Sequence, residues 1–127
     1  MKLSIYKLIL IALLLTGCSY EIKLTAEVNQ DCSVDVMFED GSPQIRYIAV
    51  AEAVGEKFDH KEPIWEIDGN YNKIEKFTYG HLPEGFDQVV GPMPLMSGKN
   101  YFFIVKGSGG GFGAVKVEYK CLTKVAN

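Results

Sequence analysis

The chain has 127 residues, with 13 basic and 16 acidic side chains and a net charge of −3. This length is sufficient for one domain whose hydrophobic core needs neither a metal nor many disulfides. The negative charge argues against nucleic acid as a partner, because nucleic-acid-binding proteins present basic surfaces to the phosphates.

Residues 1–17 have the pattern of a cleaved signal peptide. Lys2 and Lys7 give a positive start, and residues 8–15 form an unbroken apolar run. The run is too short for a membrane-spanning helix, which needs about 20 apolar residues. It has no polar face, which argues against an amphipathic N-terminal helix. Removal of residues 1–17 leaves 11 basic and 16 acidic residues, a net charge of −5.

The run ends in Leu15-Thr16-Gly17-Cys18, which resembles the lipobox of bacterial lipoproteins. The resemblance implies cleavage between Gly17 and Cys18 and lipidation of Cys18, and two or more acyl chains give stable membrane attachment. Ser19 follows the cysteine in place of Asp, which in enterobacteria-like sorting favours the outer membrane over the inner one. We therefore expect a lipid-anchored protein that faces the periplasm, with a tether at 18–21 and a single domain at 22–127.

Assignment of Cys18 to lipid leaves Cys32 and Cys121 as an even pair. An exported protein is in an oxidising compartment, where disulfides persist, so we expect these two cysteines to be bonded. A metal site would need further cysteines or suitably placed histidines. The two histidines, His60 and His81, lie far apart in apparent loops, so we expect neither a metal nor a cofactor.

Alternating apolar residues and β-branched runs predict strands over most of the mature chain. The expected strands are 21–29, 32–38, 45–54, 64–68, 73–79, 101–105 and 114–121, with a brief edge segment at 89–90. Turns are expected at 29–31, 40–43, 68–70 and 107–113. Residues 45–54 are apolar on both faces, as in a strand covered on two sides, and their alanines also allow a helix. About seven short strands predict an all-β, antiparallel sandwich.

One local pattern sharpens the fold class. Leu95, Gly98 and Tyr101 precede a strongly β segment, and this spacing resembles the Leu-x-x-Gly-x-x-Tyr corner of fibronectin type III and related immunoglobulin-like domains. In those domains the tyrosine hydroxyl bonds to upstream backbone at a crossing between the sheets. The alternative is a plain turn before an aromatic strand.

The sequence contains no motif of an established catalytic class. It has no G-x-S-x-G, no H-E-x-x-H, and no Walker or EF-hand loop. The glycine-rich segment 107–113 lacks the Lys-Ser/Thr that would hold phosphate and magnesium, and it joins two expected strands. Glu66 and Asp68 share one strand face, but alternation gives that spacing to any exposed face. We therefore expect a binding protein and not an enzyme.

Acidic residues gather between positions 52 and 68, offset only by Lys57 and Lys61. The six carboxylates are those of Glu52, Glu56, Asp59, Glu62, Glu66 and Asp68. Such a surface could meet a basic active-site cleft of a partner protein and speed association. The alternative is ordinary solvated loop charge. Trp65 lies within this segment and has two interpretations. Tryptophan can anchor a partner protein, but the alternating position of Trp65 in its strand also places it in the core.

Several segments together resemble a family of small bacterial lipoproteins proposed to be immunity proteins of type VI secretion. The shared elements are Trp65-Glu66-Ile67, the segment from Tyr79 to Phe86, Leu95-x-x-Gly98-x-x-Tyr101, the lipobox and the late Cys121. The resemblance implies a periplasm-facing protein that binds and blocks a cognate toxin. Two other functions stay open: a lipid-anchored envelope accessory or scaffold component, and an inhibitor of host lysozyme.

Overall fold

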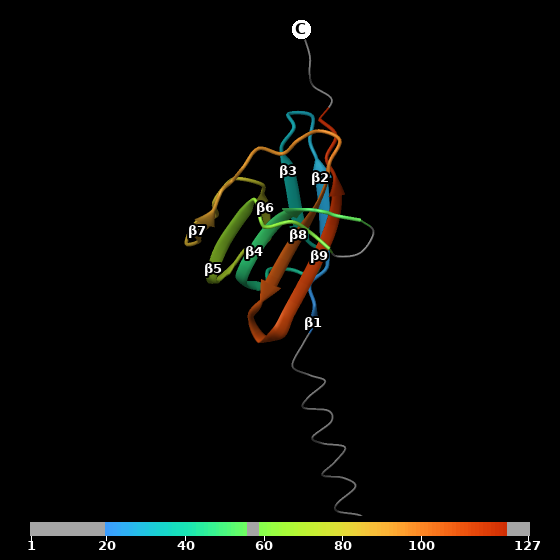
Figure 1. Ribbon diagram of the computed structural model, residues 1–127. Coiled ribbons are helices and arrows are strands. Elements are labelled where there is room, and N and C mark those ends of the chain that lie inside the picture. The colour runs from blue at the N-terminus through green and yellow to red at the C-terminus, as the bar shows by residue number, and fades with distance from the viewer. Residues whose placement is uncertain (1–19, 56–58, 122–127) are drawn as a thin grey trace, which may run out of the picture.

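The computed structural model describes residues 20–55 and 59–121, and the regular secondary structure of the described chain is almost entirely β-strand (Figure 1). The strands, in chain order, are β1 (Tyr20–Glu21), β2 (Leu24–Val28), β3 (Val34–Phe38), β4 (Gln44–Glu52), β5 (Trp65–Lys73), β6 (Lys76–Thr78), β7 (Asp87–Val90), β8 (Asn100–Gly107) and β9 (Gly111–Glu118). One short 3₁₀ turn, η1 (Ser108–Gly110), links β8 to β9. Within the described ranges, no helix is long and apolar enough to cross a membrane.

The strands form two sheets. The larger sheet has the order β1-β9-β8-β4-β5-β7, and the smaller has the order β2-β3-β6. Neighbouring strands pair in antiparallel fashion except for β1, which runs parallel to β9. The predicted all-β class with two sheets is therefore confirmed.

The two sheets share one hydrophobic core. Val34 and Val36 of the smaller sheet are fully buried, as are Val50 and Phe103 of the larger sheet. Strand alternation explains this arrangement, because every second side chain of a strand points to the same face. Trp65 is also completely buried, and its indole N–H donates to Gln88 Oε1 at 3.3 Å. The interpretation of Trp65 as a partner anchor is therefore wrong, and the core interpretation is confirmed.

The expected turn at 68–70 is wrong. β5 continues to Lys73, although Asn70 and Tyr71 have positive φ angles of 50° and 61°. Gly69 is buried, and a Cβ atom there would lie 2.6 Å from the carbonyl carbon of Ile45. The register between β4 and β5 shifts between Ile45 and Tyr47. Asp68-Gly69-Asn70 therefore marks an irregularity inside a long strand, where only glycine permits the close approach of β4.

The predicted hydrogen bond of Tyr101 is confirmed. Its ring is buried, and its hydroxyl oxygen accepts a hydrogen bond from the backbone N–H of Met96 at 2.9 Å. This bond fixes the segment that leads from the edge strand β7 to the central strand β8. Both strands belong to the larger sheet, so the expected crossing between the sheets does not occur at this segment. The helical alternative for residues 45–54 is wrong, since residues 44–52 form the central strand β4.

The bounds of the first expected strand and of the glycine-rich turn differ from the predictions. The expected strand at 21–29 is divided into β1, which joins the larger sheet, and β2, which joins the smaller one. The glycine-rich turn is confined to residues 108–110, because Gly107 and Gly111 belong to strands.

Candidate functional site

The lipidation prediction concerns Cys18, which lies outside the described residues. The described chain begins two positions later, at Tyr20. The Tyr20 hydroxyl donates a hydrogen bond to the carbonyl oxygen of Ser108 at 3.0 Å. Tyr20, within the expected tether at 18–21, is therefore fixed to the β8–β9 turn.

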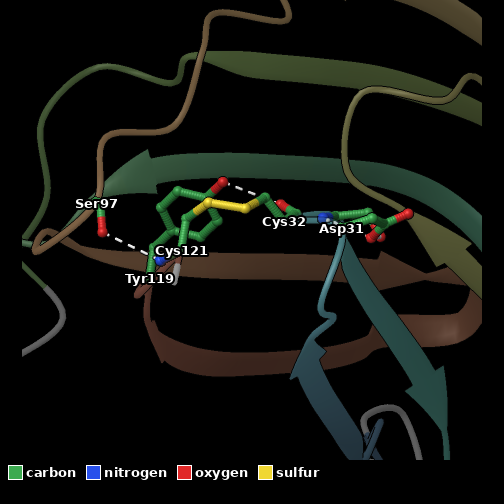
Figure 2. The surroundings of a disulfide bond; sticks show 6 residues. Asp31, Cys32, Ser97, Tyr119 and Cys121 are labelled. Carbon is green, nitrogen blue, oxygen red and sulfur yellow. Dashed lines mark hydrogen bonds between the residues drawn. A yellow bond between two sulfur atoms is a disulfide. The ribbon is translucent and has the colours of Figure 1, made fainter. Parts of the chain in front are cut away.

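Cys32 and Cys121 form a disulfide, with their Cα atoms 5.1 Å apart (Figure 2). The bond connects the β2–β3 turn to the residues that follow β9. Tyr119 Oη donates to the carbonyl oxygen of Cys32 at 2.9 Å, and the backbone N–H of Cys121 donates to Ser97 Oγ at 3.1 Å. Three segments of the chain therefore meet at this end of the sandwich.

The β2–β3 turn is organised by Asp31 beside the disulfide (Figure 2). Asp31 Oδ1 accepts hydrogen bonds from the hydroxyl of Ser33 at 2.5 Å and from its backbone N–H at 3.1 Å. These bonds favour the charged carboxylate and hold the pKa of Asp31 below its usual value. Cys32 itself has a φ of 72°, so the turn carries a non-glycine residue in the left-handed region. The hydrogen bonds of Asp31 thus hold the turn that carries Cys32 in the conformation that the disulfide requires.

Glu52 is already paired within the chain. Its carboxylate lies 3.2 Å from Lys99 Nζ and 3.6 Å from Lys61 Nζ. The hydrogen bond from Lys99 is the main cause of its lowered pKa, and the charge of Lys61 adds to it. Two lysines thus offset the charge of Glu52 and hold the base of the β4–β5 loop to the start of β8.

The other acidic residues occupy two separate places. Asp59 and Glu62 are exposed on the β4–β5 loop, whereas Glu66 and Asp68 lie on the outer face of β5, opposite the core-facing Trp65. Glu56 lies outside the described residues. The described members of the predicted acidic surface are therefore distributed over the β4–β5 loop, the end of β4 at Glu52, and the outer face of β5 at Glu66 and Asp68.

The outer face of the larger sheet contains an apolar hollow of about 450 Å³. Its lining residues are Tyr47, Ala49, Ala51, His60, Pro63, Ile104, Lys106 and Phe112. The floor comes from β4 and β8, where the small side chains of Ala49 and Ala51 leave space beside Ile104. His60 and Pro63 of the β4–β5 loop form one side, and this loop passes in front of β8 and β9 (Figure 1). Phe112, which is 48% exposed, comes from β9.

A second, more polar hollow of about 380 Å³ adjoins the first, since Tyr47 and Lys106 line both. It also includes Arg46, Asp68 and Tyr71. The Lys106 ammonium lies 5.5 Å from the centre of the Tyr47 ring. Burial, together with a hydrogen bond to Glu66, raises the pKa of Tyr47 to about 12, so its hydroxyl stays protonated at neutral pH. The two hollows form a continuous surface, named the outer-face groove below, with an apolar centre and charges of both signs around it.

Sequence reasoning did not identify the outer-face groove. It placed the candidate partner surface on loops. The expected cover of residues 45–54 on both faces is confirmed for Ala49 and Ala51, which face away from the core and are 2% and 0% exposed. The groove is open beside them, where Ile104 is half-buried and Phe112 is 48% exposed.

The described ranges contain no group of three or more His, Cys, Asp or Glu side chains arranged to hold a metal ion. The geometry of the groove fits recognition of another surface, because it combines apolar area with a few fixed polar groups. Comparison of the chain with protein-family models, with curated protein sequences and with solved structures found no match in any of the three.

Proposed function

We propose that this chain is a lipid-anchored periplasmic binding protein, an immunity protein that neutralises a cognate type VI secretion toxin by binding it. The lipobox at Leu15–Cys18 and the family resemblance of residues 65–105 support the location and the type of partner. The single structural observation that carries the proposal of protein binding is the outer-face groove.

The composition of the groove favours a protein partner. Contiguous apolar surface rimmed by charges is typical of interaction sites on soluble domains. Ile104 is half-buried in the free protein, and Phe112 is about half exposed beside it. A partner that covers both residues gains apolar burial at roughly 25 cal/mol per Å². The hydroxyl of Tyr47 and the charged rim then supply orientation.

The rim of the outer-face groove carries charges of both signs, so it complements a partner surface that also carries charges of both signs. Glu66 and Asp68 lie on one side, on β5, and Lys106 and Lys116 lie on β8 and β9. Within the acidic segment, Glu66 and Asp68 are the residues that we assign to the partner surface. The charge of Glu52 is offset internally, so we assign it a structural role.

We further propose that the fold belongs to the immunoglobulin-like class, close to fibronectin type III. In that class strands A, B and E share one sheet, and strands C, F and G share the other. We equate β2, β3 and β6 with strands A, B and E, and we equate β4, β8 and β9 with strands C, F and G. The order β2-β3-β6 in one sheet and β9-β8-β4 in the other supports this assignment. Tyr101 lies at the start of strand F under the same assignment. Strand β5 extends the larger sheet beside β4, and β1 and β7 are additions at its two edges.

The test is co-purification of the soluble domain, residues 19–127, with the product of the neighbouring gene. Ile104→Arg places a charge in the centre of the groove, and we expect it to weaken binding by roughly tenfold or more. Met37→Arg is the matched control, because Met37 is 40% exposed on β3 of the smaller sheet, on the side of the sandwich opposite the groove. If both variants bind the partner equally well, the groove is not the binding surface. If no product of an adjacent gene binds the domain, the partner is not a toxin encoded next to this chain.

A further inference from the structure

The N-terminal residues are held on one end of the sandwich. Tyr20 and Glu21 pair with Gly111 and Phe112 in a parallel ladder, and the backbone N–H of Ile22 donates to the carbonyl oxygen of Phe112 at 2.8 Å. Ile22 is only 6% exposed, so β1 is continuous with the core. The expected tether is therefore fixed from Tyr20 onward.

The glycine-rich segment permits this attachment. A Cβ atom on Gly111 would lie 2.6 Å from the Tyr20 hydroxyl oxygen and 2.9 Å from a ring carbon. A Cβ atom on Gly107 would lie 2.9 Å from the Ile22 side chain. Glycine is thus required where β1 crosses the ends of β8 and β9. The segment is a docking surface for the first residues of the mature chain as well as a turn.

The distance from this docking surface to the expected lipid is short. Cys18 is two residues before Tyr20, and two extended residues span at most about 7 Å. The turn that includes Ser42 lies next to β1, because Ser42 lines the same surface hollow as Tyr20. Figure 1 places β1 and the β8–β9 turn at one end of the sandwich, and the β2–β3 turn at the other.

We infer that this end of the sandwich, named the anchor end, rests on the lipid headgroups, and that the domain has one fixed orientation on the membrane. The inference rests on the proposed lipidation of Cys18. The anchor end comprises β1, the turn at residues 40–43 and the turn at residues 108–110. Its partner is the lipid surface itself, and the acyl chains supply the affinity.

The orientation determines what a partner protein can reach. Strands β8 and β9 have eight residues each, so they separate the two ends by roughly 25 Å. The disulfide end, with Cys32 and Cys121, is then the part farthest from the bilayer. The outer-face groove opens sideways, along the membrane surface.

The test uses full-length lipidated protein on vesicles of phosphatidylethanolamine and phosphatidylglycerol that contain brominated lipids. Ser42→Trp reports from the anchor end and Gln30→Trp from the disulfide end, and both positions are exposed. Trp65 is buried and gives the same background in both. We expect several-fold stronger quenching of Ser42→Trp than of Gln30→Trp. Equal quenching, or stronger quenching of Gln30→Trp, overturns the orientation.

A longer tether provides the second arm. Twelve glycine and serine residues inserted between Ser19 and Tyr20 have an average reach of roughly 20 Å and leave the domain unchanged. We expect the quenching of Ser42→Trp to fall several-fold while the protein still sediments with the vesicles. Unchanged quenching contradicts the role of the short tether. A protein that does not sediment with vesicles at all contradicts the lipid attachment, and with it the proposed location.

Discussion

Removal of the disulfide is expected to cost a large share of the stability of the domain. The bond joins residues 89 positions apart. Closing a loop of this length lowers the entropy of the unfolded chain enough to stabilise the folded state by about 4.5 kcal/mol. Domains of this size have a total stability of roughly 5–15 kcal/mol, so the loss is a substantial fraction.

The assay is urea unfolding of Cys32→Ala/Cys121→Ala against the disulfide-bonded protein, both with Cys18→Ser so that no lipid is attached. A slope of about 1–3 kcal/mol per molar urea converts the expected loss into a midpoint shift of roughly 1.5–4.5 M. Reduction of the parent protein should give a similar shift. A loss below about 1 kcal/mol would refute the reasoning, because it would mean that the unfolded chain gains little freedom when the bond is removed.

Three further predictions concern single residues. Gly69→Ala should destabilise the domain by ~1–3 kcal/mol, since the added Cβ meets the Ile45 backbone; a loss below about 0.5 kcal/mol in urea unfolding would contradict that contact. Tyr101→Phe should cost about 1–2 kcal/mol, because the Met96 N–H loses its acceptor, whereas the exposed Tyr71→Phe should cost nothing measurable. Because the pKa of Glu52 is lowered from 4.5 by its lysine partners, its contribution is present above pH 4.5 and is lost as the pH falls through the lowered value. Unfolding midpoints measured between pH 6 and pH 3 should therefore fall less steeply for Glu52→Gln, and identical pH profiles would show that the lysines do not stabilise the carboxylate.

Alternation made most of the strands predictable. Residues 34–38 and 111–118 alternate clearly because one face of each strand enters the core. The disulfide was predictable from the even pair of cysteines that remains once Cys18 is assigned to lipid, although Cys32 and Cys121 lie just outside the strands that were expected to contain them. The Tyr101 bond followed from a spacing of six residues that a local corner imposes.

Long-range contacts account for what the sequence did not reveal. Asp68-Gly69-Asn70 has the composition of a turn, but the approach of β4 to Gly69 keeps β5 continuous. The glycines at 107 and 111 serve Tyr20, which is about 90 positions away. The outer-face groove depends on which side of β4 the β4–β5 loop crosses, and no local pattern specifies that.

The most direct test of the central proposal is protection of living cells. The product of the neighbouring gene is exported to the periplasm in cells that also produce the full lipoprotein, its Ile104→Arg variant or its Met37→Arg variant at equal levels. The proposal predicts survival with the parent protein and with Met37→Arg, and death with Ile104→Arg. Death with the parent protein, or survival with all three, would contradict the claim that the outer-face groove neutralises a toxin.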